Sequence, residues 1–187
     1  MAFWTDNLLS TTKDPKRNFR FRVSFGAGSQ FADPTTLTGI WYAKKVQQPS
    51  VTIGESSHDF LIHKFYWPAK VEWNEIEMTL VDPVEPEVST NFYTALQNAG
   101  FVVPVNGRFT TVSKAAASIA LGNVLIEQID EAGLANHQWL LQHAWAKEVS
   151  LSDLDYSSEE LIEITLKLRY DWSEYTGKSG QPVFRTA

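Results

Sequence analysis

Cysteine is absent from this 187-residue sequence, and so is any long apolar run. Without cysteine the chain forms no disulfide, no thiolate nucleophile and no cysteine-based zinc site. A membrane-spanning helix needs about 18 consecutive apolar residues, so we expect no membrane insertion by this chain. The N-terminal sequence also lacks a basic leader followed by an apolar stretch, which predicts no secretory signal.

Basic residues are fewer than acidic ones, with 16 Lys and Arg against 22 Asp and Glu and a formal net charge of −6. This balance disfavours tight nucleic-acid binding, because cationic side chains must neutralise phosphates. A basic cluster near the N-terminus is the one plausible phosphate contact: Lys13, Lys16, Arg17, Arg20 and Arg22. On an acidic chain we favour a solvated face, or salt bridges to a neighbouring subunit.

The histidines do not have a chelating spacing. On extended strands, a separation of five residues places His58 and His63 on opposite faces. His137 and His143 would share a face but lie about 20 Å apart at about 3.3 Å per residue. We therefore interpret all four as surface or packing residues and expect no metal site.

The acidic stretch at residues 152–160 resembles a calcium loop only in composition. An EF-hand needs glycine at its sixth position and glutamate at its twelfth. Counted from Asp153, those positions hold Ser158 and Ile164. We interpret the stretch as a hairpin connection. Because no other catalytic or cofactor-binding pattern is present, we expect a protein that is not an enzyme and needs no cofactor.

Alternation of apolar and polar residues predicts a mainly β (α+β) fold. Three segments alternate most clearly, and their apolar positions are Phe19, Phe21, Val23 and Phe25; Ile76, Met78 and Leu80; and Ile162, Ile164, Leu166, Leu168, Tyr170 and Trp172. Further strands are predicted in "NVLIEQID", "LANHQWLLQHAW" and "KEVSLSDLD", and in residues 38–57 with a break at Pro49. Residues 58–73 predict an aromatic hairpin or loop with its turn at Pro68.

One principal helix is predicted at residues 86–100. Pro86 suits its first turn, Gly100 suits its C-terminal cap, and the apolar stripe comprises Val88, Phe92, Ala95, Leu96 and Ala99. The alanine-rich residues 113–122 are compatible with a helix or a connection. We predict two packed antiparallel sheets in a sandwich or barrel-like arrangement. The prediction is a single domain over residues 1–187, with an N-terminal arm (1–17) and a C-terminal tail (173–187).

Trp and Tyr concentrate in "WYAKK" and "FYWPAKVEW". Aromatic side chains on a β scaffold can stack on sugars, and they can equally be core or interface anchors. A carbohydrate-binding β-sandwich therefore stays open at this point.

Residues 124–172 resemble the C-terminal half of the tail tube protein of contractile-tailed bacteriophages. The resemblance lies in a strand ending at Asp130, a turn at Gly133, then "HAWAKEV", "SDLDYSSEE" and "LKLRYDW". Upstream, "NFRFRVSF", "KKVQQPSV" and "WNEIEMTLVDP" followed by "EVSTNFYTALQNAG" resemble the earlier elements in the same order, so that roughly residues 18–172 are covered. Ala146 departs from the pattern, because many members of the family have proline there.

The resemblance implies a tail-tube fold and a structural virion protein. Its subunits would form hexameric rings that stack into the inner tail tube, the conduit for genome delivery, with a smooth, acidic bore. Implied partners are copies of itself, the tail sheath, the baseplate or tube initiator, the tail terminator, and the tape-measure protein and double-stranded DNA inside the tube. The implied location is the virion tail, assembled in the host bacterial cytoplasm. Tubes of type VI secretion and phage-like contractile injection systems share the fold and are the alternative.

The resemblance and the strand pattern together suggest three sets of assembly residues. Lumen-facing candidates are Glu75, Glu77, Thr79, Glu163, Thr165 and Lys167, with Arg169 on the same face. Candidates for a ring-stacking loop are Gly54, Glu55, His58, Asp59, Phe60 and His63. Candidates for an arm that contacts a neighbouring subunit are Phe3, Trp4, Lys16 and Arg17.

Overall fold

The structure is a computed structural model that describes residues 16–26, 29, 40–85, 87–104, 110–178 and 180–183. The predicted arm residues Phe3 and Trp4, and Pro86 of the predicted helix, lie outside this part. The strands are β1 (Phe21–Phe25), β2 (Ala43–Val46), β3 (Val51–Phe60), β4 (His63–Trp73), β5 (Ile76–Val81), β6 (Val124–Ile129), β7 (Ala135–Gln142), β8 (Trp145–Leu151), β9 (Glu163–Arg169) and β10 (Trp172–Thr176). The helices are α1 (Val88–Asn98) and α2 (Lys114–Leu121).

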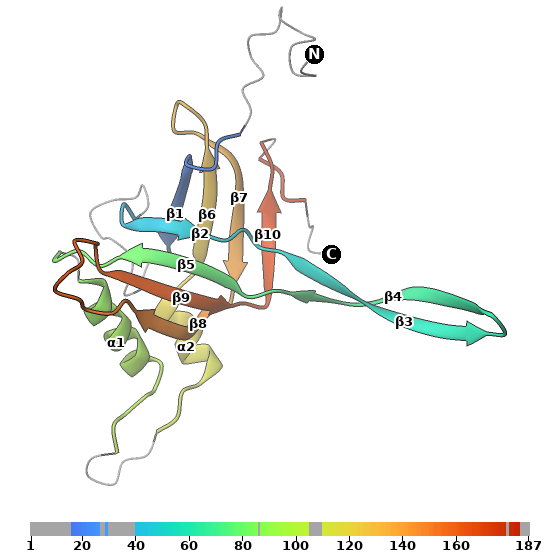
Figure 1. Ribbon diagram of the computed structural model, residues 1–187, viewed down its shortest axis with the longest axis horizontal. Helices are drawn as coiled ribbons and strands as arrows, with labels where there is room; N and C mark the ends of the chain where they lie inside the picture. Colours follow the sequence, from blue (N-terminus) through green and yellow to red (C-terminus); the bar gives the residue numbers. More distant parts are fainter. Residues whose placement is uncertain are drawn as a thin grey trace, which may run out of the picture.

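Two four-stranded sheets form a sandwich. The first has the order β1-β6-β7-β10 and the second the order β2-β5-β9-β8, and the named strand pairs are antiparallel. In Figure 1 the strands of the first sheet run vertically, those of the second cross them, and the two helices lie at the lower left, with α2 below β8. The predicted class, mainly β with two packed antiparallel sheets, is confirmed. Among the described strands neither sheet closes into a barrel.

Alternation along the central strands builds the core. Ile76, Met78 and Leu80 of β5 are buried, and so are the alternate residues of the neighbouring strand β9, Ile164, Leu166 and Leu168. They pack in one cluster with residues of the first sheet, Val23, Phe25, Val124, Ile126 and Leu141. Each fully buried side chain of this size stabilises the fold by about 1.5–3 kcal/mol, so the two sheets are held together mainly by this layer.

The two helices begin and end with recognisable local signals. Asp82 caps α1, because its Oδ1 accepts hydrogen bonds from the backbone N–H groups of Val88 and Ser89. Gly100 follows α1 with a positive φ of 108°, as its predicted role as C-terminal cap requires. The open choice at residues 113–122 is resolved as helix α2, which is capped by Ser113 through its contact with the N–H of Ala116.

Three strand predictions were wrong at their ends. Phe19 precedes β1 and is 75% exposed. The predicted strand through residue 172 ends at Arg169, and after a bend the chain enters β10, so Trp172 is not in the core. The predicted tail (173–187) therefore begins within a strand that pairs with β7. Residues 134–145 bend likewise after Gln142, because both segments pass from one sheet to the other and a straight strand cannot serve two crossing sheets.

Strands β3 and β4 form a separate antiparallel hairpin that projects from the sandwich (Figure 1). Its turn lies at Leu61 and Ile62, so the predicted turn at Pro68 was wrong. Pro68 lies inside β4, beside a β-bulge in which residues 69 and 70 face Gly54. A two-stranded ribbon consists of two edge strands, and edges and bulges are where a strand tolerates proline.

Candidate assembly surfaces

The second sheet presents a charged face on the side opposite its core residues. Pairing of β5 with β9 places Glu77 opposite Lys167, Thr79 opposite Thr165 and Val81 opposite Glu163. Glu75, which lies just before β5, joins this group through contacts with Lys147 and Arg169. The structure therefore brings all six lumen-facing candidates onto one face.

Ion pairs connect the side chains of this face. Lys147 Nζ lies 2.5 Å from Glu75 Oε1, and Arg169 Nη1 lies 3.5 Å from the same oxygen. Lys167 Nζ bonds both carboxylate oxygens of Glu148 at 2.9 Å, and Lys44 bonds Glu163. The hydrogen bond from Lys147 lowers the pKa of Glu75, and the bond to Glu148 raises the pKa of Lys167. Each shift favours the charged form, so these residues are ionised at neutral pH.

The charged face is not acidic. Its ion pairs connect four cations, Lys44, Lys147, Lys167 and Arg169, with three carboxylates, Glu75, Glu148 and Glu163. Glu77 lies opposite Lys167 and Lys45 lies opposite Thr79 in the register, so five cations and four carboxylates share this face. The acidic bore that the resemblance implies is therefore not a property of this face, because its lysines and arginine offset its carboxylates.

The hairpin is the most exposed part of the described chain, with every residue from 51 to 72 exposed to solvent. Cross-strand pairing divides the half beyond the bulge into two faces. One face carries Glu55, Ser57, Asp59, Lys64, Tyr66 and Pro68. The other carries Ser56, His58, Phe60, His63, Phe65 and Trp67, and we call it the aromatic face.

The aromatic face contains half of the ring-stacking candidates. His58, Phe60 and His63 lie on it, Glu55 and Asp59 lie on the opposite face, and Gly54 lies at the bulge. The two histidines therefore share a face. The prediction of opposite faces was wrong because the turn falls between them. Ring centroids are 6.3 Å apart for His58 and Trp67, and 6.2 Å for Phe65 and Trp67.

Sequence reasoning missed the hairpin's other apolar residues. Leu61 and Ile62 form the turn, while Val51, Ile53 and Val71 line the base of the hairpin on one face. A missed signal was available, because two alternating segments flank the dipeptide at positions 61 and 62. An isolated two-stranded hairpin is at best marginally stable in water, and contiguous exposed apolar surface marks interaction sites. The hairpin is therefore the strongest candidate for contact with another molecule.

The segment that precedes β1 contacts the first sheet of the same subunit. Lys16 Nζ lies 2.9 Å from Nδ1 of the buried His137, and Gln128 donates a hydrogen bond to the backbone oxygen of Arg17. The ring of His137 lies 4.5 Å from Trp139, edge to face. Burial, and then the charge of Lys16, lower the pKa of His137. Contacts of the arm candidates Lys16 and Arg17 with a neighbour stay a prediction.

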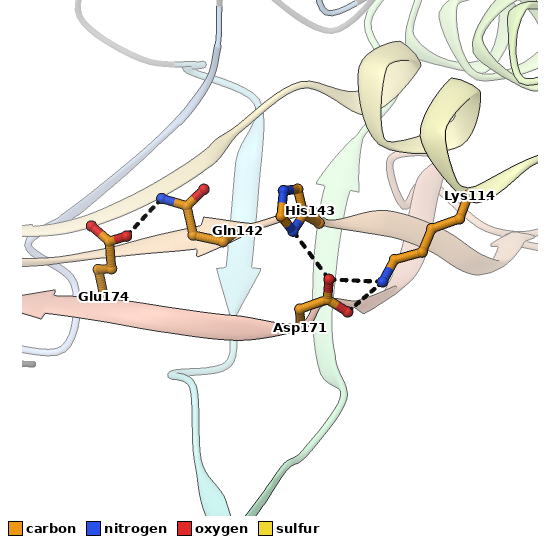
Figure 2. A network of polar contacts seen from close by, with 5 residues as sticks. All are labelled: Lys114, Gln142, His143, Asp171 and Glu174. Atoms are coloured by element: carbon orange, nitrogen blue, oxygen red, sulfur yellow. Dashed lines mark hydrogen bonds and ion pairs between the residues drawn. The ribbon is translucent and has the colours of Figure 1, made fainter. Parts of the chain in front are cut away.

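A cluster around Asp171 holds the corner at which the chain passes between the sheets (Figure 2). Lys114 Nζ donates to both carboxylate oxygens of Asp171 at 2.6 and 2.7 Å, and His143 Nδ1 lies 3.0 Å from Oδ2. The Asp171 N–H also donates to the backbone oxygen of Gln142. The hydrogen bond from Lys114 lowers the pKa of Asp171, and the His143 contact adds to this. The cluster thus joins α2 to both corner segments.

The described residues include no group of three or more His, Cys, Asp or Glu side chains placed to hold a metal ion. In the same part of the chain, no helix combines the length and apolar character needed to cross a membrane.

The sequence matches no protein-family model and no curated protein. Solved structures match over nearly the whole chain. A chain of the anti-feeding prophage baseplate has a TM-score of 0.62 and 19% identity, covering 89% of this chain and 98% of that one. A chain of the tube-terminating cap of the anti-feeding prophage has a TM-score of 0.64 and 14% identity, with 95% and 99% covered. A chain of the sheath–tube complex of an extracellular contractile injection system has a TM-score of 0.59 and 16% identity, with 90% and 96% covered.

At these identities the likeness concerns the fold, and it covers 89–95% of this chain. The chain therefore shares its fold with components of contractile injection particles. The chain has the tail-tube fold of contractile injection systems.

Proposed function

We propose that this chain is a structural subunit whose copies form hexameric rings, and that the rings stack into the inner tail tube of a contractile-tailed bacteriophage. The tube would be the conduit for genome delivery. The observation that carries the proposal is the projecting hairpin with its exposed apolar side chains, on a sandwich with the tail-tube fold. A monomer gains nothing from such a surface, whereas a repeating assembly covers it in every copy.

The second sheet supplies the wall of the proposed tube. Its edge strands β2 and β8 each have one hydrogen-bonding side without a strand partner among the described residues. Pairing of β2 in one copy with β8 in the next would join the sheets into a continuous barrel and leave no exposed edge. The core residues face outward from the bore in this arrangement, so the charged face lines it.

A wall whose charges are mostly ion-paired suits the passage of double-stranded DNA. Phosphates bind tightly to unneutralised lysines and arginines. On the charged face, the ammonium groups of Lys44, Lys147 and Lys167 and the guanidinium of Arg169 each lie beside a carboxylate. DNA would release few counterions on touching such a wall, and it would slide past. Proposed further partners are the tape-measure protein inside the tube, and the sheath, the baseplate initiator and the terminator around it.

Two alternatives predict different behaviour. A tube subunit of a type VI secretion or phage-like injection system would assemble in the same way, and the likeness to injection-system chains favours it at the level of fold. A carbohydrate-binding sandwich would use the aromatic face as a sugar platform and stay monomeric.

We place the assembled tube in the virion tail, after assembly in the host cytoplasm.

Negative-stain electron microscopy of the purified chain, combined with light scattering over a concentration series, tests the proposal. Rings with a central hole, or stacked tubes, are the expected result. A protein that stays monomeric at the highest concentration and is retained on a polysaccharide column would instead support the sugar-binding alternative. Co-packaging of DNA, or of protein cargo, in particles that contain the chain separates a phage tail from an injection system.

A further inference from the structure

The hairpin turn breaks the usual rules for a two-residue turn. Such turns favour Asn-Gly or Gly-containing pairs, because they require positive φ. Here the pair is Leu61–Ile62, and Leu61 adopts a φ of 54°. The two side chains are 88% and 92% exposed. Backbone strain and exposed apolar surface at one place are costly for a single copy, and such local violations concentrate at functional sites.

A groove of about 680 Å³ opens at one end of the sandwich, between the first sheet and β2. Apolar side chains on its walls are Phe19, Phe21, Val46, Ile126 and Trp139. The polar residues that also line it are Asn18, Lys44, Lys45, Gln48, Glu127 and Gln128, and Glu127 accepts a hydrogen bond from Arg22. Lys44 is paired with Glu163, whereas Lys45 is exposed and has no ion pair within the described residues.

The hairpin of the same copy cannot fill this groove. Figure 1 shows the hairpin running out from the sandwich, with its turn at the far end from both sheets. A second copy is therefore the source of any hairpin that reaches the groove. Because turn and groove are different parts of the chain, their contact is head-to-tail, and a head-to-tail contact repeats without limit unless it closes a ring.

Charge distinguishes this groove from the other large apolar groove. That one lies along α2 with Lys114, His143 and Asp171 at its lining, and Asp171 already contacts both of the other two side chains. On one face, the half of the hairpin beyond the bulge carries two carboxylates, Glu55 and Asp59, and one cation, Lys64, which lies opposite Asp59. Lys45 at the groove beside β2 complements the excess negative charge of that face.

We infer that Leu61 and Ile62 are the anchor by which the hairpin of one copy docks into the groove beside β2 of a second copy. The two apolar side chains would insert between Phe21, Val46 and Trp139, and Asp59 would approach Lys45. This inference rests on the proposed function, since it assigns the two sides of the stacking contact. The docking explains why the turn has a strained backbone and exposed apolar side chains in a single copy, because these side chains would be buried only in the assembly.

The absence of cysteine makes the contact directly testable. Ile62→Cys and Gln48→Cys are prepared as separate proteins and mixed under mild oxidation. Disulfides form only when the Cα atoms approach to about 4.4–6.8 Å, so covalent mixed dimers are expected. Ile62→Cys mixed with Tyr156→Cys, a fully exposed position on another loop, is the matched control and should cross-link several-fold less.

A turn exchange provides the second measurement. Leu61→Asn combined with Ile62→Gly supplies a preferred turn sequence, so the subunit should fold as well as wild type by circular dichroism and thermal melting. Its critical concentration for assembly should rise about tenfold or more, because two apolar anchors are lost. Lys45→Glu should raise the same concentration, and Val84→Asn, which alters an equally exposed apolar side chain elsewhere, should not.

The outcomes separate the two proposals. Suppose that wild type forms tubes, that the turn-exchange variant assembles equally well, and that the mixed cysteine pair cross-links no better than its control. The assignment of anchor and groove is then wrong, and the proposed tube function stands. If wild type forms no ring or tube, the proposed function fails and this inference with it.

Discussion

The sandwich and the hairpin are built from the same kind of strand, and they differ in what covers their apolar side chains. In β9 every second side chain is fully buried against the first sheet of the same copy. In β4 the aromatic side chains Phe65 and Trp67 also share one face of a strand, and they are exposed. Alternation therefore determines which side chains share a face, but it does not determine whether the covering partner is the same chain or another.

The largest effect is expected from a charge placed in the sandwich core. Ile164→Asp buries an unpaired carboxylate at a fully buried site, and it should cost at least about 4 kcal/mol, which is close to the whole stability of a small domain. Thr165→Asp, one residue along on the charged face, should leave a soluble, folded protein. Urea unfolding and soluble yield measure the difference. A folded Ile164→Asp protein would mean that the two faces of β9 are assigned the wrong way round.

Equivalent truncations in the two regions should give opposite patterns. Leu166→Ala should lower the free energy of unfolding by about 2–5 kcal/mol, because it leaves a cavity in the core. Phe65→Ala on the aromatic face should change it by less than about 0.5 kcal/mol in the monomer but should weaken assembly. Thermal melting at low concentration and light scattering at high concentration separate the two effects. The comparison breaks down if Phe65→Ala destabilises the monomer as much as Leu166→Ala does.

A smaller effect is expected on lowering the pH, and it belongs to the sandwich. Burial lowers the pKa of His137, so the unfolded chain takes up a proton at His137 where the folded chain does not. Stability due to this site is complete above the ordinary value of 6.5 and declines as the pH falls below it. The slope cannot exceed about 1.4 kcal/mol per pH unit for one proton. Urea unfolding at two pH values, for wild type and His137→Gln, should show a flatter slope in the variant.

The smallest effect is expected at the corner cluster. Asp171→Asn removes the charge that pairs with Lys114 and His143, but all three side chains are partly open to solvent. Screening limits the loss to about 0.5 kcal/mol, and less at high salt. Thermal melting at low and high ionic strength measures it. A loss as large as that of Leu166→Ala would show that the corner, and not only the apolar layer, holds the sheets together.

The core of the second sheet could be predicted from sequence because it depends on local alternation. Ile76, Met78 and Leu80 were placed correctly in the core, and the polar residues that alternate with them along β5 lie on the opposite side of the sheet. A two-residue period is all that these assignments require. Gly100 as the cap of α1 was predictable for a similar reason, since a positive φ favours glycine.

The errors fall where tertiary structure overrides local pattern. The apolar alternation continues through Tyr170 to Trp172 without showing that the chain bends into another sheet there. Neither Leu61 nor Ile62 is a residue type that favours turns, whereas proline is. The turn was therefore predicted at Pro68, although it lies at Leu61 and Ile62. The ion pairs Lys147–Glu75 and Glu148–Lys167 join residues distant in sequence, and so the mixed charge of that face became visible only in three dimensions.

The corner at His143 and Asp171 has a mechanical consequence. Two separate strands cross between the sheets at this place, β7 into β8 and β9 into β10, and a backbone hydrogen bond joins the two crossings. The two sheets are thus connected by two adjacent crossings of the chain. They can separate only if both crossings change conformation together. Such a subunit would behave as one rigid body under an axial load. In the proposed stack of rings, bending would therefore be confined to the contacts between subunits.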